Sequence, residues 1–152
     1  MPCIWGRHDG SQAILTVVVF DDGISDRVTA GGIGQPVTFH VFNALIDTGA
    51  QATCLTRRAA EKVGLLPIGK VPIMGVSGLQ YHNNYLFKIG FGFGLVPNVS
   101  EVGAAQVHIL DEIIEGAELS AGGAKFDVLL GMDIIGLGSL KIDGDGSFSF
   151  SF

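Results

Sequence analysis

Apolar residues fall in short runs separated by glycine and aspartate, which is the pattern of a chain built mainly from β-strands. The first clear run, residues 14–20, is apolar almost throughout and ends at an Asp-Asp-Gly turn signal, so we expect a strand buried on both faces. A second run, residues 37–46, alternates and then becomes uniformly apolar as it reaches Asp47. The pattern therefore predicts a strand that delivers an aspartate from the interior.

A short helix is predicted soon after this aspartate. Residues 53–55 favour an extended conformation, and the Thr56 hydroxyl can then cap a helix that runs from Arg57 to about Val63. Gly64 follows at the position where a residue in the left-handed conformation commonly ends a helix. This is the clearest helix signal in the chain.

Strands and turns account for most of the remaining sequence. Glycines at positions 75 and 78 mark the tip of a hairpin within residues 71–87. Residues 112–125 are rich in Gly, Ala and Glu, and we assign them to a loop, with a helical turn over 111–118 as the alternative. The other predicted elements are strands at 86–93, 107–110 and 126–130, a short helix at 133–135, and a hairpin over 140–152 that turns at 144–146.

Composition limits the size and the partners of this protein. A chain of 152 residues fits a single domain, here residues 1–152, and leaves no room for a two-lobed enzyme. With 47% hydrophobic and only 16% charged residues, we expect some apolar surface to be buried between subunits. A net charge of −6 offers no basic stripe for nucleic acid. The first nine residues lack the apolar core of a secretory signal and no run reaches transmembrane length, which predicts a cytoplasmic protein without a membrane partner.

Cysteine and histidine usage gives no sign of a metal or a cofactor, and we expect neither. Cys3 and Cys54 are too few for a disulfide framework, so each is expected to be a free thiol. The four histidines are scattered, without the paired spacing of a zinc site. Cys54 lies close to Asp47 in sequence and could suggest a thiol nucleophile, but an apolar strand neighbour of this kind is more often inert and buried.

The segment most informative about chemistry is ALIDTGA at residues 44–50, an acid at the end of an apolar strand followed by a hydroxyl and a glycine. Burying a carboxylate there costs free energy unless hydrogen bonds compensate. Gly49 allows a tight turn, and backbone N–H groups together with the Thr48 hydroxyl are candidate partners of the acid. Read alone, the triplet is equally compatible with an ordinary Asp-Thr-Gly turn.

The context favours chemistry, because this segment resembles the active-site signature of retropepsin-like aspartic proteases. In that family apolar residues precede Asp-Thr/Ser-Gly-Ala and a Thr or Ser begins the next strand, here Thr53. Two further segments follow in the family's order: residues 73–79 look like its glycine-rich flap, and residues 126–135 look like its apolar-apolar-Gly element with the helix after it. The order is closer to cellular members than to the compact viral enzymes.

The sequence departs from the family pattern at several places. Residues 21–34 and 96–125 look like insertions. Ser77 stands where many flaps have glycine, and Met132 replaces an arginine common in viral members. These departures concern the flap, the substrate groove and the contacts between subunits, while the acid and its neighbours match fully over residues 45–50.

The resemblance implies a mainly β, closed-barrel acid protease fold with one or two short helices, assembled as a homodimer. Each subunit would supply one Asp47, and the two acids would share a proton and activate a water for hydrolysis of a peptide or protein substrate. In the catalytic set Asp47, Thr48 and Gly49, the threonine would reach across the two-fold axis and the glycine would leave room beside the acids. The implied substrate-binding residues are Ala50, Gly75, Val76, Ser77, Gly78 and Leu79.

The C-terminal strand is expected to join the same dimer interface. Phe148, Phe150 and Phe152 alternate and therefore share one face, and exposed phenylalanines at a sheet edge would otherwise invite aggregation.

Other acidic and basic residues are assigned to structure. Asp127 and Asp133 are expected to be helix caps or hydrogen-bonded structural acids. The segment 143–146 is part of a hairpin turn, because the closing Glu of an EF-hand calcium loop is missing. Arg57 and Arg58 are expected on the solvated side of their helix.

Two alternative functions are weighed against the protease. A phosphatase with an aspartyl nucleophile would need a second Asp at position 49, where the chain has glycine. A catalytically silent dimerisation or peptide-binding module of the same fold is the closer competitor. It is disfavoured because Asp47, Thr48 and Gly49 are all intact, and a structural copy has no need of a buried acid.

Overall fold

The structure is a computed structural model that describes residues 2–21, 40–92, 94–95, 107–120 and 125–152. It is mainly β, with the helices α2 (Arg57–Val63) and α3 (Met132–Ile135) among the described residues. A three-stranded sheet contains, in order, β1 (Cys3–Arg7), β11 (Ser147–Ser151) and β10 (Ser139–Ile142). The larger sheet contains, in order, β2 (Ile14–Phe20), β3 (His40–Ile46), β9 (Val128–Leu130), β4 (Cys54–Thr56), β8 (Ile114–Leu119), β6 (Gly78–Gly92) and β5 (Gly69–Gly75), with β7 (Val107–Ile109) paired to β6.

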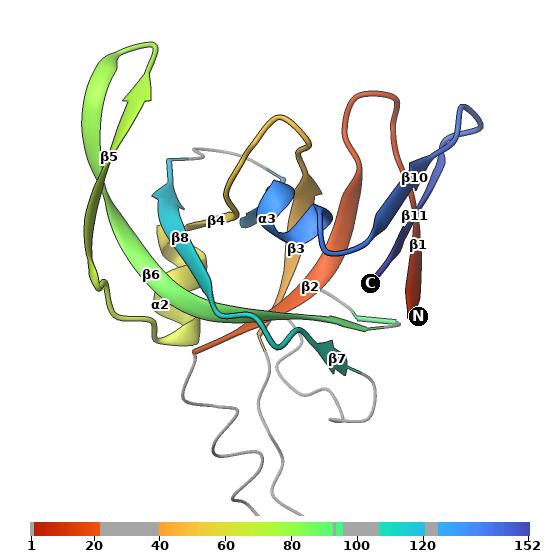
Figure 1. The fold of residues 1–152 in the computed structure, drawn as a ribbon, viewed down its shortest axis with the longest axis horizontal. Coiled ribbons are helices and arrows are strands. Elements are labelled where there is room, and N and C mark those ends of the chain that lie inside the picture. The colour runs from red at the N-terminus through yellow and green to blue at the C-terminus, as the bar shows by residue number, and fades with distance from the viewer. Residues whose placement is uncertain (1, 22–39, 93, 96–106, 121–124) are drawn as a thin grey trace, which may run out of the picture.

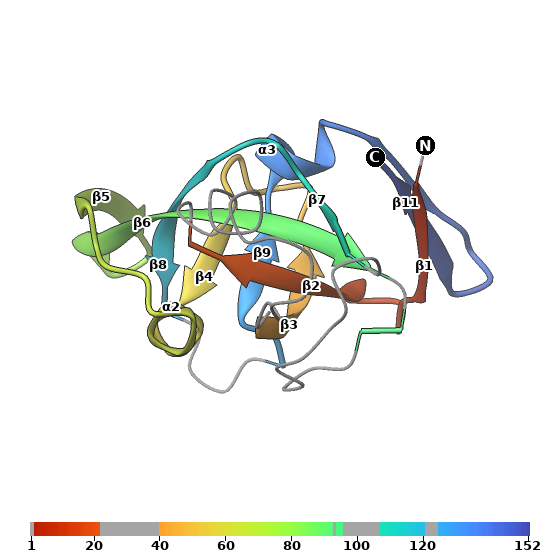
Figure 2. The ribbon, with the colours of Figure 1, turned by 90° about the horizontal axis from the view of Figure 1, so that it is seen from below.

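The larger sheet curves around the main hydrophobic core. Strand β2 pairs with β3 on one edge and with β6 on the other, so the path of paired strands returns to β2. This double pairing explains the continuous apolarity of residues 17–20, all of which are buried. Figures 1 and 2 show β2, β3 and β6 crossing the middle of the molecule, and in Figure 1 α2 lies beside the lower part of the hairpin of β5 and β6.

Strand β9 lies between β3 and β4, and this arrangement positions the segment between them. It runs parallel to β3 and antiparallel to β4. Because β3 ends at Ile46 and β4 begins at Cys54, the connecting residues 47–53 pass over the carboxyl end of β9. We call residues 47–53 the Asp47 loop.

The β5–β6 hairpin extends away from the rest of the sheet. Its strands pair from Gly69 opposite Asn84 to Gly75 opposite Gly78, and Gly78 adopts the left-handed φ of 100° that a residue with a Cβ avoids. Most side chains of β5 are exposed. In Figure 1 the tip of this hairpin and the Asp47 loop rise on the same side of the molecule.

The three-stranded sheet brings the two ends of the described chain together (Figure 1). Strand β11 is its central strand, between β1 and β10, and Phe148 and Phe150 are 1% and 2% exposed. The premise that the terminal phenylalanines lie exposed at a sheet edge is therefore wrong, because Phe148 and Phe150 pack into the core of the chain itself. Phe152 is half-buried, with its ring centroid 4.6 Å from that of Phe91.

Most predicted elements are confirmed. The Thr56 hydroxyl accepts a hydrogen bond from the Ala59 N–H at 3.2 Å, and Gly64 ends α2 with a left-handed φ of 83°. The strand at 14–20, the strand ending at Ile46, the hairpin tip at 75–78, the strands near 107 and 128, the helix at 133–135 and the terminal hairpin are all present. Residues 37–39 of the second predicted strand lie outside the described residues.

One element prediction is wrong, and another needs its bounds corrected. Residues 86–92 are extended, as predicted, but they are part of β6, which runs from Gly78 to Gly92 and pairs in turn with β5, β8, β2 and β7. Residue 93 lies outside the described residues. Residues 114–119 of the predicted loop form β8, and the alternative of a helical turn at 111–118 is equally contradicted. Residues 121–124 of that loop lie outside the described residues. None of the helices described is long and apolar enough to cross a membrane.

Candidate active site

Asp47 lies directly after β3, half-buried, at the start of an exposed turn. Its backbone N–H donates to the Leu130 carbonyl at the end of β9 at 3.0 Å, which ties the acid to the neighbouring strand. Its Oδ1 accepts a hydrogen bond from the Gly49 N–H at 2.9 Å. A Cβ at position 49 would stand only 3.2 Å from that oxygen, so glycine leaves this side of the carboxylate open. Thr48 and Gly49 are exposed, while Ala50 is half-buried.

Helix α3 and the residues before it hold the Asp47 loop from behind. The Met132 N–H donates to the Ala50 carbonyl at 2.8 Å, and the Asp133 N–H donates to the Gln51 carbonyl at 3.1 Å. Gly131 packs so closely that a Cβ there would lie 2.6 Å from the Ala52 carbonyl carbon. Residues 131–133, which directly follow β9, therefore hold the backbone of the Asp47 loop in place.

Thr53 and Asp133 complete this support with side chains. The Asp133 carboxylate accepts from the Thr53 N–H at 2.9 Å and from the Thr53 hydroxyl at 2.7 Å. The same hydroxyl accepts from the buried Gly131 N–H at 3.0 Å. The prediction that Asp133 is a hydrogen-bonded structural acid is confirmed.

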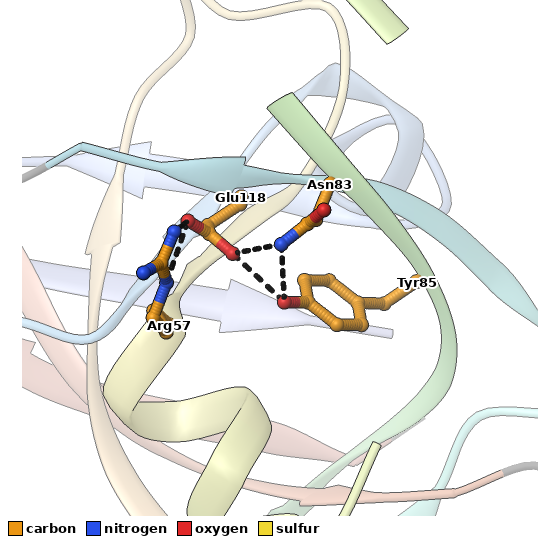
Figure 3. Close-up of polar contacts among 4 residues, drawn as sticks. All are labelled: Arg57, Asn83, Tyr85 and Glu118. Carbon is orange, nitrogen blue, oxygen red and sulfur yellow. Dashed lines mark hydrogen bonds and ion pairs between the residues drawn. The ribbon is translucent and has the colours of Figure 1, made fainter. Parts of the chain in front are cut away.

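The second structural acid, Asp127, anchors the start of α2. It is 7% exposed, accepts from the Thr56 hydroxyl at 2.8 Å, and is paired with Arg58. Arg57 pairs with Glu118 of β8 in the same manner, at 2.8 Å (Figure 3). The two arginine side chains are exposed, as predicted, by 66% and 70%. Each guanidinium nevertheless pairs with a buried carboxylate, and these two ion pairs were not predicted from the sequence.

The predicted substrate-binding residues form two groups. Ala50 lies in the Asp47 loop, whereas residues 75–79 form the hairpin tip, where Val76 is fully exposed and Leu79 is 54% exposed. Among the hydrogen bonds of the described residues, none joins the tip to the Asp47 loop. The structure thus brings Asp47, Thr48, Gly49 and Ala50 together and leaves the tip separate from them.

The connection between β1 and β2 also borders the site, and sequence reasoning missed it. A pocket is lined by Ile46 and Thr48, by residues 8 and 10–13 of this connection, and by Ile142 of β10. The Ile46 N–H donates to the Ala13 carbonyl at 2.9 Å. Backbone hydrogen bonds from Gln12 and Ser11 lower the pKa of Asp9 to about 2, so this turn is held by an ionised acid. The Asp9-Gly10 pair was the available sequence signal.

Cys54, the thiol that lies close to Asp47 in sequence, is not an activated nucleophile. Cys3 and Cys54 are both free, as predicted. Burial raises the pKa of Cys54, which disfavours the thiolate that a nucleophile requires. Within the part of the chain that is described, no group of three or more His, Cys, Asp or Glu residues is placed to hold a metal ion.

Strand β9 lies between β3 and β4, and an acid directly follows β3. The fold is similar to that of a retropepsin-like aspartic protease from Rickettsia conorii, with a TM-score of 0.52 and 14% sequence identity over 98% of this chain and 89% of that chain. A family model described as aspartyl protease matches residues 27–134, and the chain belongs to this family. A search of curated proteins finds no match to this sequence. The resemblance stated from the sequence is confirmed.

Proposed function

We propose that this protein is an aspartic endopeptidase in which Asp47 is the catalytic acid. Membership of the aspartyl protease family supports a protease-type function and implies peptide substrates. The observation that carries the proposal is the state of Asp47: its backbone is tied to β9 and one carboxylate oxygen is held by the Gly49 N–H, at the edge of an exposed turn. A carboxylate with a fixed orientation and access to solvent is what water activation requires.

The second carboxylate is proposed to come from a second copy of the chain. The sequence contains one Asp-Thr-Gly triplet, and a water-activating dyad needs two acids. A two-fold axis beside the Asp47 loop would place Asp47 next to Asp47 of the partner subunit. The exposure of Thr48 and Gly49 supports this assembly, because both residues are available to a partner.

The proposed chemistry needs no covalent intermediate. Two carboxylates about 3 Å apart hold one proton between them, because both cannot ionise easily. The ionised acid accepts a proton from a water molecule, whose oxygen attacks the peptide carbon while the protonated acid donates a hydrogen bond to the carbonyl oxygen. The tetrahedral intermediate then collapses, the nitrogen takes a proton, and the C–N bond breaks to give a carboxylic acid and an amine.

The β5–β6 hairpin is proposed to act as a flap over the bound peptide. Residues 75–79 form the tip of the hairpin, where an extended peptide could pair with the backbone, and the exposed side chains of Val76 and Leu79 favour apolar residues near the cleaved bond. Ala50 would line the cleft beside the acid. We further propose that residues 1–152 form one domain around a closed barrel, which the pairing of β2 with both β3 and β6 supports.

The test is hydrolysis of a proteome-derived peptide library by the wild type and Asp47→Asn in parallel, at pH values between roughly 4 and 7, with products read by mass spectrometry. We expect cleavage by the wild type alone, highest below neutral pH because the dyad must keep one proton. Circular dichroism of both proteins controls for folding. A rate that keeps rising above neutrality, or equal cleavage by Asp47→Asn, would contradict the proposal. A folded dimer that cleaves nothing would favour the silent peptide-binding module.

A further inference from the structure

The β5–β6 hairpin leaves the body of the protein at a fork in the sheet. From Phe87 to Asn84, β6 pairs with β8. Beyond Asn84, β6 pairs only with β5, while β8 turns to β4 and pairs Glu118 with Leu55. Burial changes across the same few residues, because Tyr85 is 3% exposed and Tyr81 is 66% exposed. The angle at which the hairpin projects is therefore decided at Asn84 and its neighbours.

Glu118 bridges the two diverging strands with its side chain (Figure 3). Its Oε2 accepts from the Tyr85 hydroxyl at 2.8 Å and from the Asn83 amide nitrogen at 2.9 Å, and both of these residues belong to β6. Its Oε1 accepts from Nε and Nη2 of Arg57, at 3.0 and 2.8 Å, from the first turn of α2. One oxygen thus holds the base of the hairpin, and the other is held by the body of the protein.

The opposite face of the fork has its own contact. The Asn84 amide nitrogen donates to Glu115 Oε1 at 2.5 Å, and the Asn84 carbonyl accepts from the Ile68 N–H at 2.8 Å just before β5. Neighbouring residues of a strand point to opposite faces, so the side chains of Asn83 and Asn84 are hydrogen-bonded on opposite faces of β6. This concentration of side-chain hydrogen bonds at one point of β6 is more than strand pairing alone requires.

The charge of Glu118 makes this contact strong. The residue is 8% exposed, and such burial disfavours a carboxylate unless its oxygens are satisfied. Against this burial, hydrogen bonds from Arg57, Asn83 and Tyr85 hold the pKa of Glu118 below its usual value. Burial together with the Glu118 carboxylate raises the pKa of Tyr85, so the phenol remains a donor. Hydrogen bonds to a charged acceptor are roughly twice as strong as neutral ones.

We propose that Glu118 is a positioning residue of the flap, which fixes the direction of the β5–β6 hairpin by holding Asn83 and Tyr85 against Arg57. The role deepens the proposed protease function and rests on it. The side-chain hydrogen bonds of Glu118 go to Arg57, Asn83 and Tyr85, and not to the Asp47 loop. Glu118 acts on substrate binding through the hairpin, while the Asp47 loop is supported separately by β9 and α3.

Hydrogen exchange tests the positioning role without relying on any activity. Tyr85→Phe removes one donor while keeping the buried ring, and Glu118→Gln removes the charge. We expect the amides of residues 70–82 to exchange roughly tenfold faster in either variant than in the wild type, because the base of the hairpin opens more often. The amides of β2 should keep their protection in Tyr85→Phe.

Two matched controls separate positioning from general loss of stability. Asp127→Asn removes the other buried acid that pairs with α2, and it should lower the melting temperature without selectively accelerating exchange in residues 70–82. Asn43→Ala removes an amide on β3 whose contact is a long hydrogen bond of 3.3 Å to the Lys125 carbonyl. It serves as the control for Asn83→Ala, which should act as Tyr85→Phe does. If Asp127→Asn accelerates amide exchange in residues 70–82 as much as Tyr85→Phe does, the proposal is overturned.

Steady-state kinetics supply a second readout. If the wild type hydrolyses peptides, Tyr85→Phe and Asn83→Ala should raise KM about 3- to 10-fold and leave kcat within about twofold, since the acids are undisturbed. A fall in kcat at constant KM would contradict the assignment. If no peptide is cleaved, the protease proposal fails, and the exchange experiment still decides whether Glu118 positions the hairpin.

Discussion

The Asp47 loop and the β5–β6 hairpin are built in opposite ways. The loop is short, and its backbone is bonded on one side to β9 through Leu130 and on the other to α3 through Met132 and Asp133. The hairpin is long, its β5 side chains are mostly exposed, and its contacts with the body gather at its base. The Asp47 loop is thus supported along its backbone, whereas the hairpin is held only at its base.

This division matches the two tasks of a peptidase. Chemistry requires the acid to be held in one geometry before substrate arrives, whereas binding an extended peptide requires an element that opens and closes. Changes to the loop should therefore affect stability and kcat together. Changes to the hairpin should affect KM and local exchange and leave global unfolding almost unaltered.

The largest effect is expected for Gly131→Ala. A Cβ at this position would lie 2.6 Å from the backbone of Ala52. The Ala52 backbone cannot move aside easily, because the Asp47 loop is hydrogen-bonded to both β9 and α3. We expect the free energy of unfolding to fall by about 1–3 kcal/mol. We also expect peptide hydrolysis to be lost, because the Asp47 loop would be displaced. Gly144→Ala is the control, because a Cβ there has no atom within 4 Å. Denaturant unfolding of both variants tests this, and equal stability would contradict the close packing.

Thr53→Val should have the next largest effect. The side chain is fully buried, and valine keeps its shape but loses the hydroxyl that links Asp133 to the Gly131 N–H. Leaving that N–H without a partner should cost about 1–3 kcal/mol of stability. Thr16→Val on β2 is the matched control. If thermal unfolding shows the same change for both variants, the hydroxyl does not support the loop.

The contribution of Glu118 to stability should depend on pH with a defined sign. Its folded-state pKa lies below the unfolded value of 4.5, so the stabilisation is fully present above pH 4.5 and is lost as the pH falls through the lower folded value. The difference in stability between wild type and Glu118→Gln should be constant above that pH and shrink below it. Urea unfolding over this range measures it. A gap that widens on acidification would reverse the assignment.

Gly78→Ala should have the smallest effect on global stability. The position has a φ of 100°, so alanine strains the hairpin tip by roughly 1 kcal/mol, but the tip is exposed and can distort locally. We expect an unchanged melting temperature and a KM that rises several-fold. A drop in melting temperature as large as that of Gly131→Ala would show that the hairpin and the loop are not independent.

Local sequence signals predicted the elements whose cause is local. Helix α2 begins and ends where its capping threonine and glycine stand, and the Asp-Thr-Gly triplet marked the acid because its neighbours along the chain are the residues that shape its turn. The terminal hairpin was found through its Gly-Asp-Gly turn. These features depend on residues within a few positions of one another.

Elements that depend on partners far away in the sequence were missed or assigned to the wrong type of structure. Strand β1 pairs with β11, which lies at the other end of the sequence. The residues around Cys3 carry no local pattern that predicts this strand. Strand β8 was taken for a loop because its inward position Gly116 has no side chain to show alternation. A Cβ there would lie 2.5 Å from the Thr53 carbonyl oxygen. The partners of Arg57 and Arg58 were missed for the same reason, since Glu118 lies in β8 and Asp127 directly precedes β9.

Subunit mixing decides whether the catalytic dyad is made from two copies of Asp47. Wild type and Asp47→Asn are combined in equal amounts, allowed to exchange subunits, and assayed for peptide hydrolysis at mildly acidic pH. A mixed dimer has one carboxylate and should be inactive, so activity should fall to about a quarter of that of wild type at the same total concentration. Activity of about one half of that of wild type after demonstrated exchange would mean that each subunit works alone, which would contradict a shared dyad.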